Sequence, residues 1–179
     1  MRAKLHYDMR AERSGGDART RGVIVGLIGG LVGTIAMDLF GAALFVAMGG
    51  PPSLSFTIIG DAAAGFFATL GVALAGGAPL GALLHYLIGL ALGGIFGAAV
   101  SSIAVLHLDS WKKAAGLGVL YVEIASQPLL AAAALILHMT AAETAQWFGI
   151  SFVMHLVYGL VLGLVARYGL RAGRAARPA

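Results

Sequence analysis

The stretch GVIVGLIGGLVGTIAMDLFGAALFVAM, residues 22–48, decides the fold. Asp38 is its only charged side chain. A helix of about 20 mainly apolar residues is long enough to cross the hydrocarbon core of a bilayer, which is roughly 30 Å thick. Two glycines and two prolines follow directly at residues 49–52. The pattern therefore predicts a membrane-spanning helix over residues 22–48.

The composition of the whole chain also predicts that lipid, rather than water, surrounds most of it. The chain has 179 residues, of which 59% are hydrophobic and 11% are charged. A soluble domain carries about 25% charged residues. So few charges cannot cover a surface in water, whereas lipid removes that requirement. We expect one integral membrane domain over residues 22–168, in contact with the lipid bilayer.

Three more apolar runs predict spans over residues 79–106, 114–137 and 147–168, with an outer loop at residues 138–146. The segment 53–76 is also apolar but contains Asp61 and many small residues. A fifth span there would put the basic segments on opposite sides of the membrane. We therefore expect an interfacial or re-entrant helix. The predicted fold class is all-α, a polytopic transmembrane four-helix bundle.

The basic residues are grouped in a way that predicts orientation. Of the twelve lysines and arginines, six precede the first apolar run, two lie at Lys112 and Lys113, and four are near the C-terminus. This is the positive-inside pattern, so the tails 1–21 and 169–179 are expected in the cytoplasm. No basic face is interleaved with aromatic residues, which argues against nucleic-acid binding. The absence of cysteine excludes disulfides and thiolate metal sites.

An internal repeat is visible in the second and fourth spans. HYLIGLALG at residues 85–93 and HLVYGLVLG at residues 155–163 are identical at five of nine positions. GLIGGLVG at residues 26–33 aligns more weakly with GLGVLYVE at residues 116–123. The pattern predicts two similar two-span hairpins, related by an axis along the membrane normal, with 53–76 inserted in the first. His85 and His155 should then occupy equivalent positions.

These segments, LGALLHYLIGLALGGIFG (80–97), FVMHLVYGLVLGLVARYG (152–169) and GLIGGLVGTIAMDLF (26–40), resemble the YagU-like family of small bacterial inner-membrane proteins. The resemblance covers residues 22–168. It implies the four-span architecture with a histidine and a following glycine in the second and fourth spans. It brings no catalytic residues.

Polar residues inside the predicted spans are the candidates for function, because a centrally placed acid costs roughly 2.5–3.5 kcal/mol to insert. Counting residues along each span places Glu123 near the midplane and the other acid and the histidines in the outer half of the bundle, where we expect them to border one polar cavity. The predicted site consists of Asp38, His85, Glu123 and His155, with Gln127 and His138 as possible additions.

Three interpretations of this site remain open. The histidines can act as interhelical hydrogen-bonding groups that bind nothing. Together with the acids they can form a protonation or divalent-metal site. Alternatively, His85 and His155 can be axial ligands of a haem. The identity of a metal or cofactor does not follow from the residues.

Glycines recur every fourth residue on two of the spans, at Gly89, Gly93 and Gly97, and at Gly159 and Gly163. Such small-residue faces predict close helix packing, within the bundle, in a homo-oligomer or in a larger membrane complex. No phosphate-binding loop, G-x-S-x-G or H-E-x-x-H sequence is present. We therefore expect no enzymatic activity.

Two functions are compatible with these observations. The first is ion, proton or small-solute handling through the polar site. The second is a non-catalytic structural or accessory subunit that packs against a partner complex or holds a cofactor. A hydrated cavity that joins the polar residues favours the first, whereas glycine faces turned outward favour the second.

The topology is testable with reporter fusions. Fusions after Ala179 and at Lys112 should report the cytoplasm, and fusions near Pro51 and Glu143 should report the outer side. The basic clusters are the physical reason, because they resist translocation. An outer C-terminus would overturn the four-span prediction and favour five spans.

Overall fold

The computed structural model describes the backbone of residues 2–175 and the side chains of residues 16–172. Within these residues the regular structure is helical. In chain order the elements are α1 (Arg2–Ala47), α2 (Leu54–Thr69), α3 (Ala78–Ser102), the 3-10 turn η1 (Ala104–Leu106), α4 (Trp111–Ile136) and α5 (Ala141–Ala175). The predicted all-α class is therefore confirmed.

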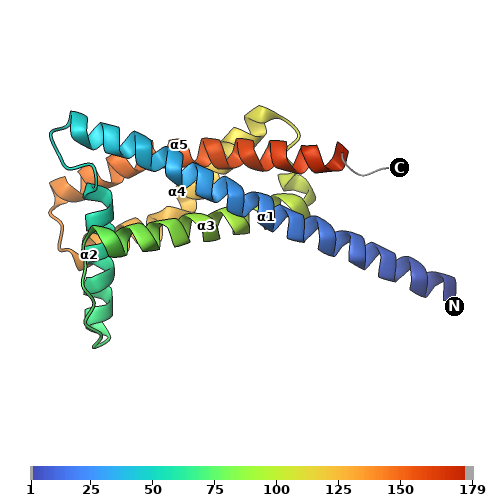
Figure 1. Cartoon of the computed structure of the whole chain (residues 1–179), viewed down its shortest axis with the longest axis horizontal. Helices are drawn as coiled ribbons and strands as arrows, with labels where there is room; N and C mark the ends of the chain where they lie inside the picture. Colours follow the sequence, from blue (N-terminus) through green and yellow to red (C-terminus); the bar gives the residue numbers. More distant parts are fainter. Residues whose placement is uncertain (1, 176–179) are drawn as a thin grey trace.

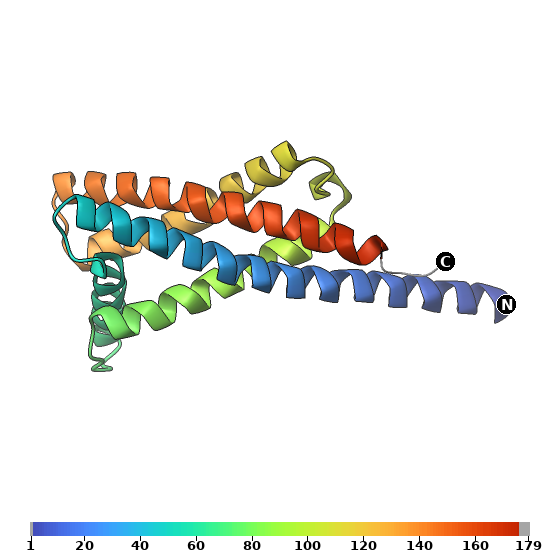
Figure 2. The same ribbon diagram turned by 45° about the horizontal axis from the view of Figure 1, so that its top comes forward.

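Four of the helices are long and apolar enough to cross a membrane, as expected. Their qualifying segments are Gly16–Ala47, Ala78–Ser102, Trp111–Ile136 and Ala141–Ala172. They pack as a bundle, whereas the 16-residue α2 lies across one end of it (Figure 1). The start of α1 and the end of α5 lie toward the other end, as Figure 2 also shows.

Glycine lets the helices of each hairpin approach to backbone contact. A Cβ added at Gly26 of α1 would collide with the carbonyl oxygen of Gly93 in α3, and one at Gly97 would collide with Gly22. In the second hairpin, a Cβ at Gly118 of α4 would meet the carbonyl oxygen of Gly159 in α5. All five glycines that the sequence analysis assigned to packing lie at helix–helix contacts of this kind.

Helix α1 joins the two hairpins because it presents glycine on a second face. Gly33 of α1 lies against Tyr158 of α5, and Gly29 lies against Leu162. Tyr158 and Leu162 are among the most deeply buried side chains of the described chain. The core of the bundle is therefore built where α5 packs on α1, with Met37, Val122 and Ala166 also buried.

Local sequence signals at two turns explain where α1 ends and where α5 begins. Gly49 follows α1 with φ +79°, a conformation that costs glycine little, and the next amide, from Gly50, donates to Phe45. Thr140 and Glu143 form a capping box: the Thr140 amide donates to the Glu143 carboxylate, and the Glu143 amide donates to the Thr140 hydroxyl. This box starts α5.

Several helix ends differ from the approximate boundaries predicted for the segments. Residues 1–21 were expected to form a separate tail, but α1 is a continuous helix from Arg2. Residues 169–175, expected in the C-terminal tail, continue α5. The outer loop 138–146 is shorter, because the capping box begins α5 at Ala141. The second long helix ends at Ser102, and η1 occupies residues 104–106.

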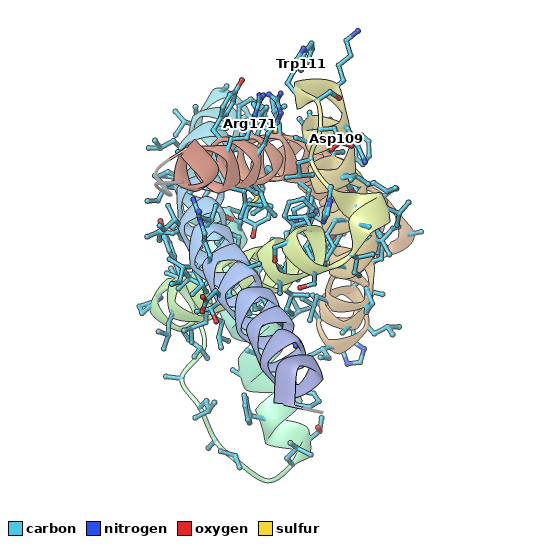
Figure 3. The ribbon with its side chains drawn as sticks, turned by 90° about the vertical axis from the view of Figure 1, so that its right-hand side faces the viewer. Asp109, Trp111 and Arg171 are labelled. Atoms are coloured by element: carbon cyan, nitrogen blue, oxygen red, sulfur yellow. The ribbon has the colours of Figure 1, made fainter. Side chains whose placement is uncertain are left out.

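The end of the bundle opposite α2 carries the basic residues of the described chain. Figure 3 places Asp109, Trp111 and Arg171 at this end, on the connection before α4, at the start of α4 and near the end of α5. The Arg21 guanidinium donates to the carbonyl oxygen of Gly169, and the Lys113 ammonium lies 3.0 Å from the Asp109 carboxylate. The two ends of the bundle therefore differ strongly in polarity.

The close approach of α1 and α3 is testable by adding a single methyl group. Gly93→Ala would place Cβ 2.7 Å from the Gly30 Cα, so the helices must separate. Overpacking of this kind costs about 1–3 kcal/mol. We expect a lower thermal unfolding midpoint in detergent, measured by circular dichroism. Gly116→Ala is the control, because no atom lies within 4 Å of its added Cβ. Equal midpoints for the two variants would contradict the packing.

Candidate functional site

A cavity of about 400 Å³ lies in the half of the bundle that α2 covers. All five helices contribute to its wall. Most of the wall is apolar, including Met37 from α1, Phe66 from α2 and Leu130 from α4. Ligand cavities in proteins are typically of this size and character, with a few polar groups that orient the ligand. Here those groups are Thr34, Ser55, His85, Ser126, Trp147, Ser151, His155 and Tyr158.

His85 stands at the boundary between the cavity and a buried acid. Its Nε2 lies 3.0 Å from Oδ1 of Asp38, and both side chains are mostly buried. Neither atom makes a well-directed hydrogen bond within the described residues, so the pair is a close contact between a ring nitrogen and a carboxylate oxygen. Phe56 of α2 packs edge-on against the His85 ring, with centroids 5.6 Å apart. The helix that lies across the bundle therefore also covers this pair.

His155 makes the corresponding contact in the second hairpin, with a hydroxyl in place of the acid. Its Nδ1 lies 3.1 Å from the Ser126 hydroxyl oxygen. The same hydroxyl also contacts the backbone carbonyl of Glu123, at 3.3 Å. Each histidine thus has one ring nitrogen engaged by a polar side chain from the preceding long helix. The first pair is ionisable at both groups and the second is not.

Two tyrosines fasten the cavity wall to the backbone of α3. The Tyr158 hydroxyl donates to the carbonyl oxygen of Gly89 at 2.6 Å, and the Tyr121 hydroxyl donates to that of Leu92 at 3.0 Å. A carbonyl oxygen in a helix has a second lone pair free for such a bond. These bonds hold α4 and α5 against α3 beside the two histidines.

The other predicted site residues do not join His85 and His155. Glu123 has both carboxylate oxygens buried without a hydrogen-bond partner among the described side chains, and it does not line the cavity. Gln127 and His138 are exposed. Asp38 touches His85 but is not part of the wall. The expectation that all of these residues border one cavity is therefore wrong: only His85 and His155 line it, and Asp38 reaches it only through its contact with His85.

Sequence reasoning missed several polar groups of the wall, above all Trp147 and Ser151. The spacing of Trp147, Ser151 and His155, four residues apart on α5, places them on one helix face and could have indicated them. The indole nitrogen of Trp147 is buried and has no hydrogen-bond partner within the described part of the chain. Serine and tryptophan are common in spans, so without the fold the signal was weak.

The arrangement bears on the metal and haem interpretations. Across the residues that the structure describes, no three histidine or acidic side chains gather closely enough to hold a metal ion. Nε2 of His85 faces Asp38, so Nδ1 is the nitrogen of that ring left for another partner.

No family model, no curated protein and no solved structure matches the chain. The site is therefore interpreted from its own geometry.

The Asp38–His85 pair is testable by a double-mutant cycle. Asp38→Ala and His85→Ala should each destabilise the protein, and together by less than their sum, because each single change removes the same contact. Contacting pairs show coupling energies of about 0.5–3 kcal/mol. Reversible unfolding in sodium dodecyl sulfate measures the free energies. The control cycle pairs Glu123→Ala with His85→Ala and should be additive. Additivity in both cycles would contradict the pair.

Proposed function

We propose that the protein is a four-span bacterial inner-membrane protein that binds a small, mainly apolar solute in the cavity and handles it without chemical conversion. The Asp38–His85 pair lies beside the binding site. The observation that carries the proposal is the cavity itself, whose wall is apolar and includes a histidine from each hairpin. Solute binding rather than ion binding is favoured because the wall contains no acidic or basic side chain besides the two histidines.

The orientation of the bundle in the membrane follows from the position of its basic residues. Lys113, Arg167 and Arg171 lie at the end of the bundle away from α2. The positive-inside rule assigns that end to the cytoplasm, which places α2 and the cavity toward the outer surface. Helix α2 has 16 residues and runs across the bundle, so we assign it to the outer interface.

A duplicated hairpin accounts for the two histidine sites. Gly30 packs between Gly89 and Gly93, and Gly118 packs between Gly159 and Gly163. The sequence alignment of residues 26–33 with residues 116–123 pairs Ile28 with Gly118. The glycine contacts shift that alignment by two residues, so that Gly30 corresponds to Gly118. The number of residues that separates Gly30 from Gly118 is the same as the number that separates Asp38 from Ser126. If Gly30 corresponds to Gly118, then Asp38 corresponds to Ser126.

With this register the two polar pairs become equivalent. Asp38 pairs with His85, and Ser126 pairs with His155, at matching positions of the two hairpins. The resemblance to the YagU-like family rests on the same histidines. Replacement of the acid by a serine in the second hairpin makes the two histidine sites chemically different.

The accessory-subunit alternative has less support. It requires glycine faces that turn outward to a partner. Gly93, Gly97, Gly159 and Gly163 are buried between helices of the same chain. An additional partner is thus not needed to explain them.

Solute binding is testable by filling the cavity. Ala133 is 7% exposed and lines the wall, so Ala133→Phe should occupy the space. Ala131, two residues away, is exposed and outside the wall, so Ala131→Phe is the matched control. In the Trp111→Phe background, Trp147 is the only tryptophan of the chain, which is placed in nanodiscs whose scaffold protein lacks tryptophan.

The probe is N-phenyl-1-naphthylamine, an apolar fluorophore that accepts energy from tryptophan. We expect a saturable transfer signal from Trp147 that Ala133→Phe abolishes and Ala131→Phe leaves intact. A signal that is non-saturable, or equal in both variants, reflects probe dissolved in lipid and would overturn the proposed function.

A further inference from the structure

The hydrogen bonds around His155 select one form of its imidazole. The Ser126 hydroxyl has a single hydrogen, and the Glu123 carbonyl can only accept. If both contacts of that hydroxyl are hydrogen bonds, Ser126 donates to the carbonyl and His155 Nδ1 donates to the Ser126 oxygen. In a neutral imidazole the other nitrogen, Nε2, is then an acceptor.

That acceptor belongs to a residue of the cavity wall. His155 lines the cavity, and Nε2 has no hydrogen-bond partner among the described residues. No ion pair reaches its ring within the same part of the chain. Ser151, one helical turn before His155 on the same face, also lines the cavity and is 4% exposed. Its hydroxyl can donate to an oxygen atom held near Nε2.

The rest of the wall argues for a neutral ligand. Tyr158 uses its hydroxyl hydrogen on the Gly89 carbonyl, and His85 directs Nε2 to Asp38. A charged group in this cavity would lack an opposite charge from the wall, and burying an unpaired charge is costly. An alcohol or phenol oxygen is neutral, donates one hydrogen bond and accepts others.

We propose that the cavity takes a neutral, mainly apolar molecule that carries a hydroxyl group, and that His155 Nε2 accepts the hydrogen bond from this hydroxyl. This inference rests on the proposed function and names its ligand class. A ring-shaped phenol and a long-chain alcohol of lipid origin share the required chemistry. Ser126 also lines the cavity, but its hydroxyl hydrogen is used on the Glu123 carbonyl, so for this hydrogen bond it is a positioning residue that acts through the tautomer of His155.

The test compares ligands that differ only in the hydroxyl hydrogen. The ring pair is 2-naphthol and 2-methoxynaphthalene, and the chain pair is 1-dodecanol and 1-methoxydodecane. Each competes with N-phenyl-1-naphthylamine in nanodiscs, with concentrations corrected for partition into empty discs. One hydrogen bond should make the hydroxyl compound about three- to tenfold tighter. A preference in the ring pair alone indicates a phenol, and one in the chain pair alone indicates a lipid alcohol.

Variants assign the preference to His155. His155→Phe keeps a ring but removes the acceptor, so the hydroxyl preference should disappear while the methoxy compound still binds. Ser126→Ala frees the tautomer, so Nε2 can donate and the preference should shrink while binding persists. His107→Phe is the control, because His107 is exposed and does not line the cavity.

The two proposals fail in different ways. If the probe signal is insensitive to Ala133→Phe, the binding function itself is wrong. If that signal is sensitive but hydroxyl and methoxy compounds compete equally, only the hydroxyl inference is wrong. Retention of the full preference in His155→Phe would also overturn the role of His155.

Discussion

Backbone contact between glycine faces is the constraint on which the rest of the structure depends. Helices in lipid gain little from burying apolar surface against one another, so they associate through close packing and polar contacts. Gly26 against Gly93, and Gly118 against Gly159, bring the backbones of each hairpin together. Gly33 of α1 then admits the ring of Tyr158 from α5. Larger residues at these positions would separate the hairpins and remove the wall of the cavity.

The same packing sets the positions of the polar groups. Close approach of α1 and α3 brings Asp38 to His85, and that of α4 and α5 brings Ser126 to His155. Away from the glycine contacts the helices leave a space that α2 covers with Phe56, Phe66 and Phe67. The cavity is thus a consequence of tight packing at one end of the bundle and of an inserted helix at the other.

The candidate site was predictable only in part from the residues. His85 and His155 were identifiable because they repeat with their glycines, and the cost of an unpaired acid in lipid led us to expect an acid near one of them, without saying which. The exclusion of Glu123, Gln127 and His138 was not predictable. Depth along a span follows from counting residues, but the direction of a side chain depends on helix rotation, and helix rotation is set by packing partners far away in sequence.

By itself, the sequence determined the solvent, the number of long apolar helices and the glycine faces, because these depend on composition and on spacing within one helix. Only the tertiary structure decided which faces meet, how α1 and α5 join the hairpins, and that Trp147 and Ser151 share a cavity with both histidines. The physical reason is that a cavity is a property of the space between helices. Its wall draws residues from all five of them, and no local pattern encodes their relative rotation.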